Sequence, residues 1–445
     1  MTKLFFSSHY ADKSSRAAIK AIIISAFLSI IIKGFGFLKE SMIAYYFGVS
    51  EYIDFYVLTL IFVTFFASPI GGSLATLLTQ KFIEIKLRIS KNASADIFIK
   101  CQVFGFASMI VIISIQIVLL HTSVVKEWIE SRFSILEIDY TLFLLPIGAL
   151  TVMSLINSSI LTAEKQFKTY TILPVLVPIT ILIALTNFSH QNLFQVLMIS
   201  TLLGFLLEFL FSFFCIRNVL MSIKLQLIKK SNQEFRKIVN SMPPMVMSSI
   251  VMSGCLIVDQ LMATLAGSGS VSIINFGNRI PLAFISIIAI IWTVLYPKFI
   301  ELVSKKNFVQ LRKNLTFFSI ISVVLLVPLC TFFAYFSEEI TSILYERGAF
   351  NANNTYVVSQ VQLIYLLHIP LYVLCMIYMR VANALEKAKI ILIGNILLLI
   401  LNITLNFYFI NIFGLIGIPL ATLAAYSFVT VFWFLTTSLL IRNRL

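Results

Sequence analysis

Long apolar segments recur along the whole chain, and their length constrains the fold more than any other feature of the sequence. A helix needs about 20 apolar residues to cross a bilayer, whereas a strand of a membrane barrel needs about 10. We predict twelve spans of helical length, six on each side of a basic stretch. The predicted spans are 17–38, 52–77, 97–120, 137–161, 168–187, 192–216, 243–266, 280–303, 314–336, 355–383, 388–410 and 412–440. The chain is therefore expected to be an all-α polytopic membrane protein.

The composition excludes most classes of soluble protein. Of the 445 residues, 59% are hydrophobic and 12% are charged, whereas a soluble domain is about half apolar and about a quarter charged. An ordinary cytosolic enzyme, a disordered chain and a disulfide scaffold are thus excluded. Twelve helices use roughly 250 residues, so the remainder is too short for a large extramembrane domain.

The distribution of basic residues indicates the orientation of the spans. The formal net charge is +14, from 33 Lys and Arg against 19 Asp and Glu. In a soluble chain this excess would suggest nucleic acid as a partner. We reject that partner, because most of the cations fall in the even-numbered connections and the two tails, as in cytoplasmic loops. We predict that both termini are cytoplasmic and that no removable signal peptide precedes the first span.

A basic linker divides the chain near its middle. We predict an N-lobe with helices 1–6 over residues 1–216, a cytoplasmic linker over 217–242 and a C-lobe with helices 7–12 over 243–445. The linker ends in two prolines, Pro243 and Pro244, which suit the start of a helix.

Short motifs recur at about half the chain length, which indicates a duplication. The matched positions are Glu40, Ala44 and Gly48 with Asp259, Ala263 and Gly267, and Glu164-Lys165 with Glu386-Lys387. Six helices per repeat is an even number, so both lobes insert the same way up, as parallel pseudo-repeats. Two six-helix lobes around a central cleft are the architecture of a transporter with a site near the membrane midplane.

Charged residues within the spans are the candidates for function. A charge at the bilayer centre costs about 2.5–3.5 kcal/mol on insertion scales, so such residues are usually paired or functional. The charged residues that stand out are Lys33, Lys39, Asp54, Asp259, Arg279 and Arg380. One interpretation is structural: interfacial side chains, a helix cap at Asp54 and buried ion pairs. The other is a set of cations that line a cleft and hold an anionic headgroup, because Lys and Arg bind phosphate.

Motifs for catalysis and nucleotide binding are missing from the sequence. It has no G-x-x-x-x-G-K-[ST] loop, no H-E-x-x-H and no pair of Cys or His at metal spacing. We therefore expect a protein that is not an enzyme and that binds no organic cofactor. An ion gradient or the membrane potential would then supply the energy.

Several motifs resemble those of one transporter family. The run KGFGFLKE from Lys33, followed by A-x-x-F-G and then Asp54-Phe-Tyr, resembles the first-helix signature of the MurJ (MviN) lipid II flippases. The segments SGSVSIINFGNRI at 268–280, LYPKF from Leu295 and LYERGAF from Leu344 resemble three further family motifs. Order and spacing agree from about residue 15 to residue 425.

The resemblance implies a fold and an activity. The fold is that of the multidrug/oligosaccharidyl-lipid/polysaccharide (MOP) exporter superfamily, which includes the MATE drug transporters. The activity is transfer of an undecaprenyl-pyrophosphate-linked saccharide to the outer leaflet of the bacterial inner membrane by alternating access. The implied partners are this lipid-linked oligosaccharide, membrane lipids and the proteins of cell-envelope glycan synthesis. The implied pyrophosphate-binding residues are Lys33, Lys39, Asp54 and Arg279, to which we add Arg380 for its depth in a span.

The resemblance also implies a coupling-ion site. A sodium site described in the family would fall on Asp259, Asn402, Asn406, Ile418 and Thr422. Asn402 and Asn406 are one turn apart and share a helix face. Polar packing between helices is the alternative role for these residues, and H⁺ is the alternative ion.

Departures from the family pattern concern the charge and the length. Both family arginines of the first helix are lysines here, which keeps the charge but loses the bidentate fork. A further arginine of the second helix falls near Ala67, and an acid often found at position 406 is an amide. The two additional C-terminal helices of the family are missing. This length is more usual for flippases of O-antigen, capsule or exopolysaccharide repeat units, so the identity of the saccharide stays open between these and lipid II.

Three other functions are weighed against the flippase. A MATE-like cation-coupled drug antiporter would need acids, rather than cations, that face the cleft. A membrane polysaccharide polymerase or ligase would usually carry a sizeable outer loop with catalytic residues. The longest outer loops predicted here lie near 121–136 and 337–354 and are short. A non-transporting partner in envelope assembly would tolerate alanine at the cationic positions.

Overall fold

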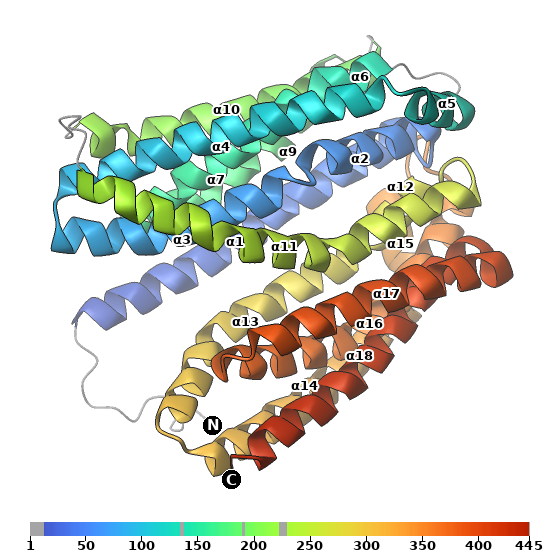
Figure 1. Ribbon diagram of the computed structural model, residues 1–445. Coiled ribbons are helices and arrows are strands. Elements are labelled where there is room, and N and C mark those ends of the chain that lie inside the picture. The colour runs from blue at the N-terminus through green and yellow to red at the C-terminus, as the bar shows by residue number, and fades with distance from the viewer. Residues whose placement is uncertain (1–12, 134–137, 189–191, 222–228, 445) are drawn as a thin grey trace. The chain divides into compact units, whose positions relative to one another are not determined.

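The structure is a computed structural model, which describes residues 13–133, 138–188, 192–221 and 229–444. Within these residues every regular element is a helix (Figure 1). The first half of the chain holds α1 (Lys13–Phe47), α2 (Glu51–Thr64), α3 (Ala67–Arg88), α4 (Lys91–Leu120), α5 (Ser123–Arg132), α6 (Ile138–Leu144), α7 (Pro146–Ala163), α8 (Phe167–Ile172), η2 (Leu173–Val175), α9 (Leu176–Asn187) and α10 (Leu193–Met221). The second half holds α11 (Lys229–Ala263), η3 (Thr264–Ala266), α12 (Ser270–Gly277), α13 (Arg279–Ser304), α14 (Phe308–Tyr335), α15 (Ser337–Tyr345), α16 (Ala352–Ala384), α17 (Ala388–Phe413), η4 (Gly414–Ile416) and α18 (Gly417–Arg442).

These helices confirm the predicted fold class. Each of the twelve predicted spans coincides with one helix or with a series of helices separated by short breaks. In the described part of the chain, nine segments are long and apolar enough to cross a membrane, or ten if the bent pair α2–α3 is one span. One of the nine contains both α17 and α18. The chain is therefore a multi-pass, all-helical membrane protein.

Prolines mark the breaks within three of the predicted spans. The pair α2–α3 bends by 40°, and Pro69 lies in the first turn of α3. Pro146 begins α7 directly after α6, and Pro174 lies in the short η2 turn between α8 and α9. Proline lacks a backbone N–H and is tolerated in a first turn, whereas it interrupts a helix that approaches from upstream. In these three predicted spans the apolar sequence is therefore continuous, whereas the helix is broken near the proline.

Three helices end in the same backbone motif without a glycine. Lys165, Lys306 and Glu386 follow the ends of α7, α13 and α16 with φ of 59°, 54° and 58°. In each case the next backbone N–H donates to the carbonyl five residues back, as in a Schellman motif. The equivalent positions in the two halves are thus Lys165 and Glu386. The motif alignment of Lys165 with Lys387 thus differs by one residue from the structural equivalence, because the Glu-Lys pair lies one position later relative to the left-handed residue at the end of α16.

The chain folds into two compact units, each built from discontinuous segments. Unit 1 is Met1–Lys39, Ile70–Ser114 and Leu145–Met242, and unit 2 is Glu40–Pro69, Ile115–Leu144 and Pro243–Leu445. The boundary between the units runs within α1, α4 and α11. The expectation that Pro243 and Pro244 begin helix 7 is wrong, because α11 begins at Lys229 and contains both prolines. The lobe boundaries 1–216 and 243–445 stay a prediction. Residues 222–228 of that linker and the N-terminal residues 1–12 lie outside the described residues.

The interior of unit 1 is centred on α10, which packs against α7 and α9. Gly204 of α10 allows a close approach, because a Cβ there would lie 2.9 Å from the Cα of Val177 in α9. A polar chain crosses the same packing: Gln102 of α4 donates to Asn157 of α7, which donates to Ser212 of α10 at 2.8 Å. Hydrogen bonds of this kind hold apolar helices in register within a membrane.

The interior of unit 2 is centred on α16, which packs against α12, α13, α14, α15, α17 and α18. Small residues again bring backbones together. A Cβ on Gly277 of α12 would lie 2.7 Å from Val361 of α16. The helix α16 therefore supplies one wall of the cavity that is described below.

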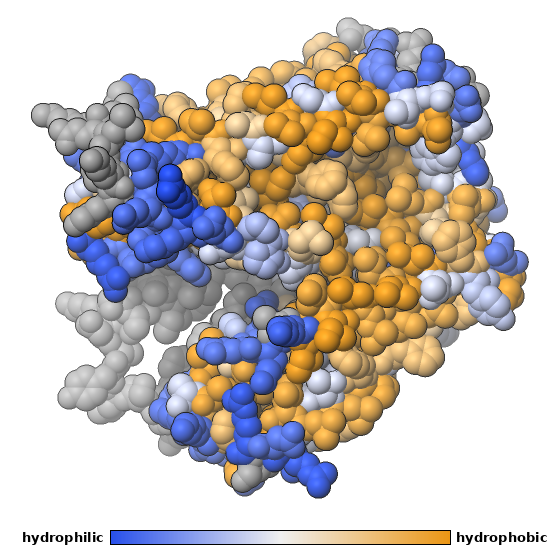
Figure 2. Space-filling view, in the orientation of Figure 1, coloured by the Kyte–Doolittle hydropathy of each residue, from blue (hydrophilic) through white to orange (hydrophobic). Residues whose placement is uncertain are grey.

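Apolar side chains also cover much of the outside. Figure 2 shows hydrophobic residues over most of the visible face, with hydrophilic residues gathered toward its edges. On α14, Phe317, Val324, Leu325 and Phe332 are exposed. Exposed apolar helices of this length are expected only where lipid, rather than water, surrounds them.

Candidate functional site

The end of α1 carries a buried carboxylate that is paired with a cation. Glu40 is 4% exposed, and its Oε1 lies 2.7 Å from Nη2 of Arg279, the first residue of α13. The same guanidinium donates to Oδ1 of Asn275 at 3.1 Å. A carboxylate removed from water needs a cation or several donors, and Arg279 supplies the cation. One of the predicted pyrophosphate ligands is thus held by an acid of this chain.

Asp54 caps a helix that lies far away in the sequence. Its Oδ2 accepts from the backbone N–H of Gly269 at 2.7 Å, and its Oδ1 accepts from that of Ser272 at 2.6 Å. These amides belong to the N-terminus of α12, whose own N-cap residue is a glycine without a capping side chain. An anion is favoured there by the free N–H groups and by the helix dipole. Asp54 thus caps a helix, as the structural interpretation of the sequence expects, but the helix is α12 and not the one that contains Asp54.

The segment after α15 holds the end of α1 through its backbone. The N–H of Ala349 donates to the carbonyl of Tyr45 at 2.8 Å, and the hydroxyl of Ser41 donates to the carbonyl of Leu344 at 2.7 Å. Gly348 has a φ of 60°, and a Cβ at this position would collide with the Tyr45 carbonyl. The glycine of the LYERGAF motif is thus explained by a left-handed turn and a close backbone approach.

We call this group of contacts within unit 2 the polar latch. It consists of the Glu40–Arg279 ion pair, the cap of Asp54 on α12 and the backbone contacts between α1 and residues 344–349. The latch joins the ends of α1 and α2, from the first half of the chain, to elements of the second half.

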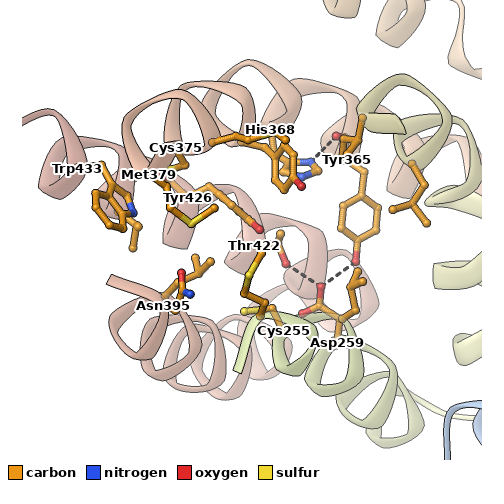
Figure 3. A pocket seen from close by; sticks show the side chains of 18 of the residues that line it. Cys255, Asp259, Tyr365, His368, Cys375, Met379, Asn395, Thr422, Tyr426 and Trp433 are labelled. Carbon is orange, nitrogen blue, oxygen red and sulfur yellow. Dashed lines mark hydrogen bonds between the residues drawn. The ribbon is translucent and has the colours of Figure 1, made fainter. Parts of the chain in front are cut away.

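Asp259 forms the centre of a second buried cluster, in which every partner is neutral. Its Oδ1 accepts from the side-chain amides of Asn402 and Asn406 at 3.0 and 2.9 Å. Its Oδ2 accepts from the hydroxyls of Thr422 and Tyr365 at 2.8 and 3.2 Å (Figure 3). The partners come from α16, α17 and α18, so the carboxylate of α11 binds three helices together. Sequence reasoning missed Tyr365, because a tyrosine within a predicted span carries no charge to single it out.

The cluster also has the chemistry of a cation site. The Oδ1 atoms of Asn402 and Asn406 are buried and have no hydrogen-bond partner among the residues that the structure describes. Rotation of both amides by half a turn exchanges each nitrogen for this oxygen. Oxygens of Asp259, Asn402, Asn406 and Thr422 would then point inward, and hard cations prefer such ligands. The residues present therefore fit a sodium ion.

Ile418 is the fifth residue of the predicted sodium site. Ile418 is fully buried on α18, one turn before Thr422, and offers only its backbone carbonyl as a ligand. Among the residues that the structure describes, no group of three His, Cys, Asp or Glu side chains could hold a metal ion. A cation at Asp259 would thus depend on amide, hydroxyl and carbonyl oxygens rather than on several charges.

A cavity of about 220 Å³ extends from this cluster along α16 within unit 2. Asp259 and Tyr365 lie at one end, while Met379, Asn395 and Trp433 lie at the other (Figure 3). Between these ends the described wall includes His368, Tyr372, Tyr426, Cys255 and Cys375. His368 is buried among the tyrosines and bonds through Nδ1 to the Tyr365 carbonyl. Arg380 lines the end away from Asp259 and stacks on the ring of Tyr296.

The predicted cations do not form one group in this structure. Arg279 is the first residue of α13. Arg380 belongs to α16, but its guanidinium stacks on Tyr296, which lies on α13. Seventeen residues of helix separate Arg279 from Tyr296, which is roughly 25 Å. Lys33 and Lys39 belong to unit 1 and lie on α1. Lys33 is seven residues before Glu40 and so shares its helix face.

Solved structures with the same architecture define the class of protein. A lipid II flippase MurJ in an inward closed conformation matches with a TM-score of 0.70 at 21% identity, over 94% of this chain and 87% of that one. An inward-facing MATE family multidrug transporter of the MOP superfamily matches with a TM-score of 0.72 at 14% identity, over 94% and 98%. The chain thus has the fold of the MOP transporters, as the sequence motifs predict.

Sequence comparison identifies the family within that class. The family model described as lipid II flippase MurJ matches residues 43–443. A probable lipid II flippase MurJ of Rickettsia prowazekii is 24% identical over 410 residues, which cover 90% of this chain and 80% of that protein. The chain belongs to the MurJ lipid II flippase family.

Proposed function

We propose that the chain is a flippase that moves a polyprenyl-pyrophosphate-linked saccharide from the inner to the outer leaflet of a bacterial inner membrane. Family membership supports this function, and the family description makes lipid II the first candidate substrate. The lipid-linked saccharide and the surrounding membrane lipids are the expected partners, together with proteins of cell-envelope glycan synthesis. Both termini are proposed to be cytoplasmic, from the distribution of Lys and Arg.

The polar latch is the observation that carries the mechanism. A transporter that works by alternating access must close one side while the other is open, and must then release that closure. The latch joins the two halves of the chain through one ion pair, one helix cap and a few backbone contacts. We assign it to the outer side, since it holds the predicted outer end of α1. Opening it would let the saccharide leave toward the outer leaflet.

Arg279 is proposed to change partners during this cycle. In the structure its guanidinium is neutralised by Glu40. When the latch opens, the freed guanidinium can bind an oxyanion with its planar fork. Lys33 and Lys39 on α1 would supply the further charge that a pyrophosphate needs. Asp54 would reform the cap on α12 when the substrate has left, and so return the protein to the closed state.

Sodium is proposed as the coupling ion, held by Asp259, Asn402, Asn406 and Thr422 with the backbone of Ile418 nearby. The two unpartnered amide oxygens support this site. When bound, the cation would neutralise Asp259 and strengthen the connection between α11, α17 and α18. Protonation of Asp259 is the alternative, and it would make the unfolding midpoint respond to acid but not to sodium.

Complementation in two depletion strains tests the function. One strain lacks its lipid II flippase, and the other lacks its O-antigen flippase. Rescue of viability in the first is the expected result. Rescue of surface polysaccharide in the second alone would make the substrate a repeat unit instead. Rescue of neither strain, with raised resistance to cationic drugs, would favour a MATE-like antiporter, whose fold the chain shares.

Charge reversal at Lys39 tests the proposed pyrophosphate site. Lys39→Glu should abolish rescue while the protein still inserts in the membrane at wild-type amounts. The matched control is Lys91→Glu, which reverses an exposed lysine at the start of α4. Retained rescue by Lys39→Glu would remove Lys39 from the site.

A further inference from the structure

The end of the cavity away from Asp259 presents a cation that has no acidic partner among the described residues. Arg380 lies about one turn before the end of α16 and lines this cavity. Its guanidinium carbon is 5.3 Å from the centre of the Tyr296 ring. Within the residues that the structure describes, Arg380 forms neither an ion pair nor a side-chain hydrogen bond, and its buried Nε–H has no acceptor. A guanidinium within a membrane bundle is normally matched by an anion.

The acid in the same cavity is too far away to be that anion. Asp259 bonds to Tyr365, and fifteen residues of α16 separate Tyr365 from Arg380, which is roughly 22 Å of helix. Asp259 supplies the only carboxylate among the described residues that line the cavity. The two ends therefore carry opposite charges that do not neutralise each other.

The side chains around Arg380 add a hydrogen-bonding group and an aromatic wall. Asn395 of α17 is 7% exposed and lines the cavity, and its buried side-chain nitrogen has no partner within the described part of the chain. Trp433 of α18 closes the wall beside it (Figure 3). An amide that can turn and an arginine fork are the groups that recognise an oxyanion with two acceptor oxygens.

The depth of this end indicates where such an anion comes from. Tyr296, Arg380, Asn395 and Trp433 each lie within three turns of one end of the bundle, at the side that holds residues 305–307 and 385–387. That is the depth at which lipid headgroups and soluble ions meet a membrane protein.

We propose that this end of the cavity binds an oxyanion of the phosphate class, with Arg380 as the cation and Asn395 as the second donor. The anion is either free phosphate or the headgroup of an anionic lipid. This site lies away from the polar latch, and it does not depend on the proposed flippase function.

Thermal unfolding of the full chain in nanodiscs tests the site. In phosphatidylcholine discs, potassium phosphate should raise the unfolding midpoint by about 2–5 °C over potassium chloride of equal ionic strength, because a ligand of the folded state stabilises it. Arg380→Gln should lose this rise, and Arg380→Lys should keep part of it. The matched control is Arg442→Gln, which removes an exposed arginine at the end of α18 and should leave the rise unchanged.

A second variant separates ligand binding from damage to the fold. Asn395→Asp places a carboxylate beside Arg380, so it should raise the midpoint without phosphate and abolish the response to it. Discs with phosphatidylglycerol identify the source of the anion. The ligand is a lipid headgroup if this lipid raises the midpoint of the wild type but not that of Arg380→Gln. In that case phosphate should add no further rise. A wild type that responds to neither, or an Arg380→Gln or Asn395→Asp protein that still responds, would overturn the proposal.

Discussion

Glu40 and Asp259 occupy matching positions in the two halves of the chain, and the protein neutralises them in different ways. Both are buried, at 4% and 3% exposure, and each precedes a buried alanine by one turn and a left-handed glycine by two. Glu40 is paired with the guanidinium of Arg279. Asp259 has four neutral donors and, among the described residues, no cation.

The difference indicates how a duplicated position has acquired two roles. A carboxylate with a built-in cation needs nothing from outside and can act as part of a latch. A carboxylate with neutral donors leaves a negative charge in a region of low dielectric, which favours uptake of a cation or a proton. In the proposed mechanism, the first half supplies the closure and the second half supplies the ion site.

The largest effect is expected when the ion pair becomes a pair of like charges. Arg279→Glu should abolish rescue of a flippase-depleted strain and lower stability by about 3–5 kcal/mol, since it removes the cation from the buried Glu40 and places a second, half-exposed acid against it. The exchange Glu40→Arg with Arg279→Glu should recover part of the stability, as measured by unfolding in nanodiscs. If the double variant is as unstable as the sum of the single variants, the pair makes no specific contribution.

A smaller effect is expected at the cap of α12. Asp54→Ala should cost about 1–2 kcal/mol, because two backbone N–H groups lose their acceptor. Asp54→Asn should cost less, since one oxygen remains. The same unfolding measurement checks both, with Asp139→Asn, an exposed acid at the start of α6, as control. Equal midpoints for the Asp54 and Asp139 variants would show that the cap does not stabilise the protein.

The ion site should respond to sodium by a few degrees. We expect sodium to raise the unfolding midpoint by about 2–4 °C over potassium at equal ionic strength. Asp259→Asn should remove this response, whereas Asn406→Asp should strengthen it by adding a charged ligand. Asn411→Asp, an exposed position on α17, is the matched control. A midpoint that rises on acidification but ignores sodium would assign a proton to Asp259 instead.

The smallest effect is expected at an accessible ion pair, and salt should distinguish it from the buried one. Lys81 of α3 lies 3.0 Å from Glu234 of α11 in unit 1, and both remain partly exposed. Glu234→Gln should lower stability by less than about 1 kcal/mol, and 1 M salt should erase the difference. Glu40→Gln should keep most of its cost under the same conditions. Equal salt sensitivity of the two variants would contradict the burial of Glu40.

The sequence is sufficient for the helices but not for their breaks. An apolar run of 20 residues has few alternatives in a membrane, so the spans and the class follow directly. The breaks near Pro69, Pro146 and Pro174 do not follow, because proline at a helix start and proline at an interruption look the same in sequence. The two compact units could not be predicted from the sequence either, because the boundary between them runs through continuous helices.

The candidate residues could be predicted better than their partners. Asp54, Asp259 and Arg279 stand out because charge is costly in lipid. Their partners are backbone amides, neutral side chains and an acid from the other half of the chain, and only tertiary packing brings these together. Asn402, Asn406 and Thr422 were found through resemblance, and the structure places all three on Asp259.

The left-handed ends of α7 and α13 bear on how the chain enters the membrane. Glycine is the usual residue at that position of a Schellman motif, and a lysine there strains the backbone by about 1 kcal/mol. Lys165 and Lys306 stand in connections that the positive-inside rule assigns to the cytoplasm. Glycine would relax the finished protein but would remove a charge that the translocon reads while the helices are still being inserted. In the predicted orientation, these two lysines would add positive charge to cytoplasmic connections during insertion, at a small cost to the stability of the folded state.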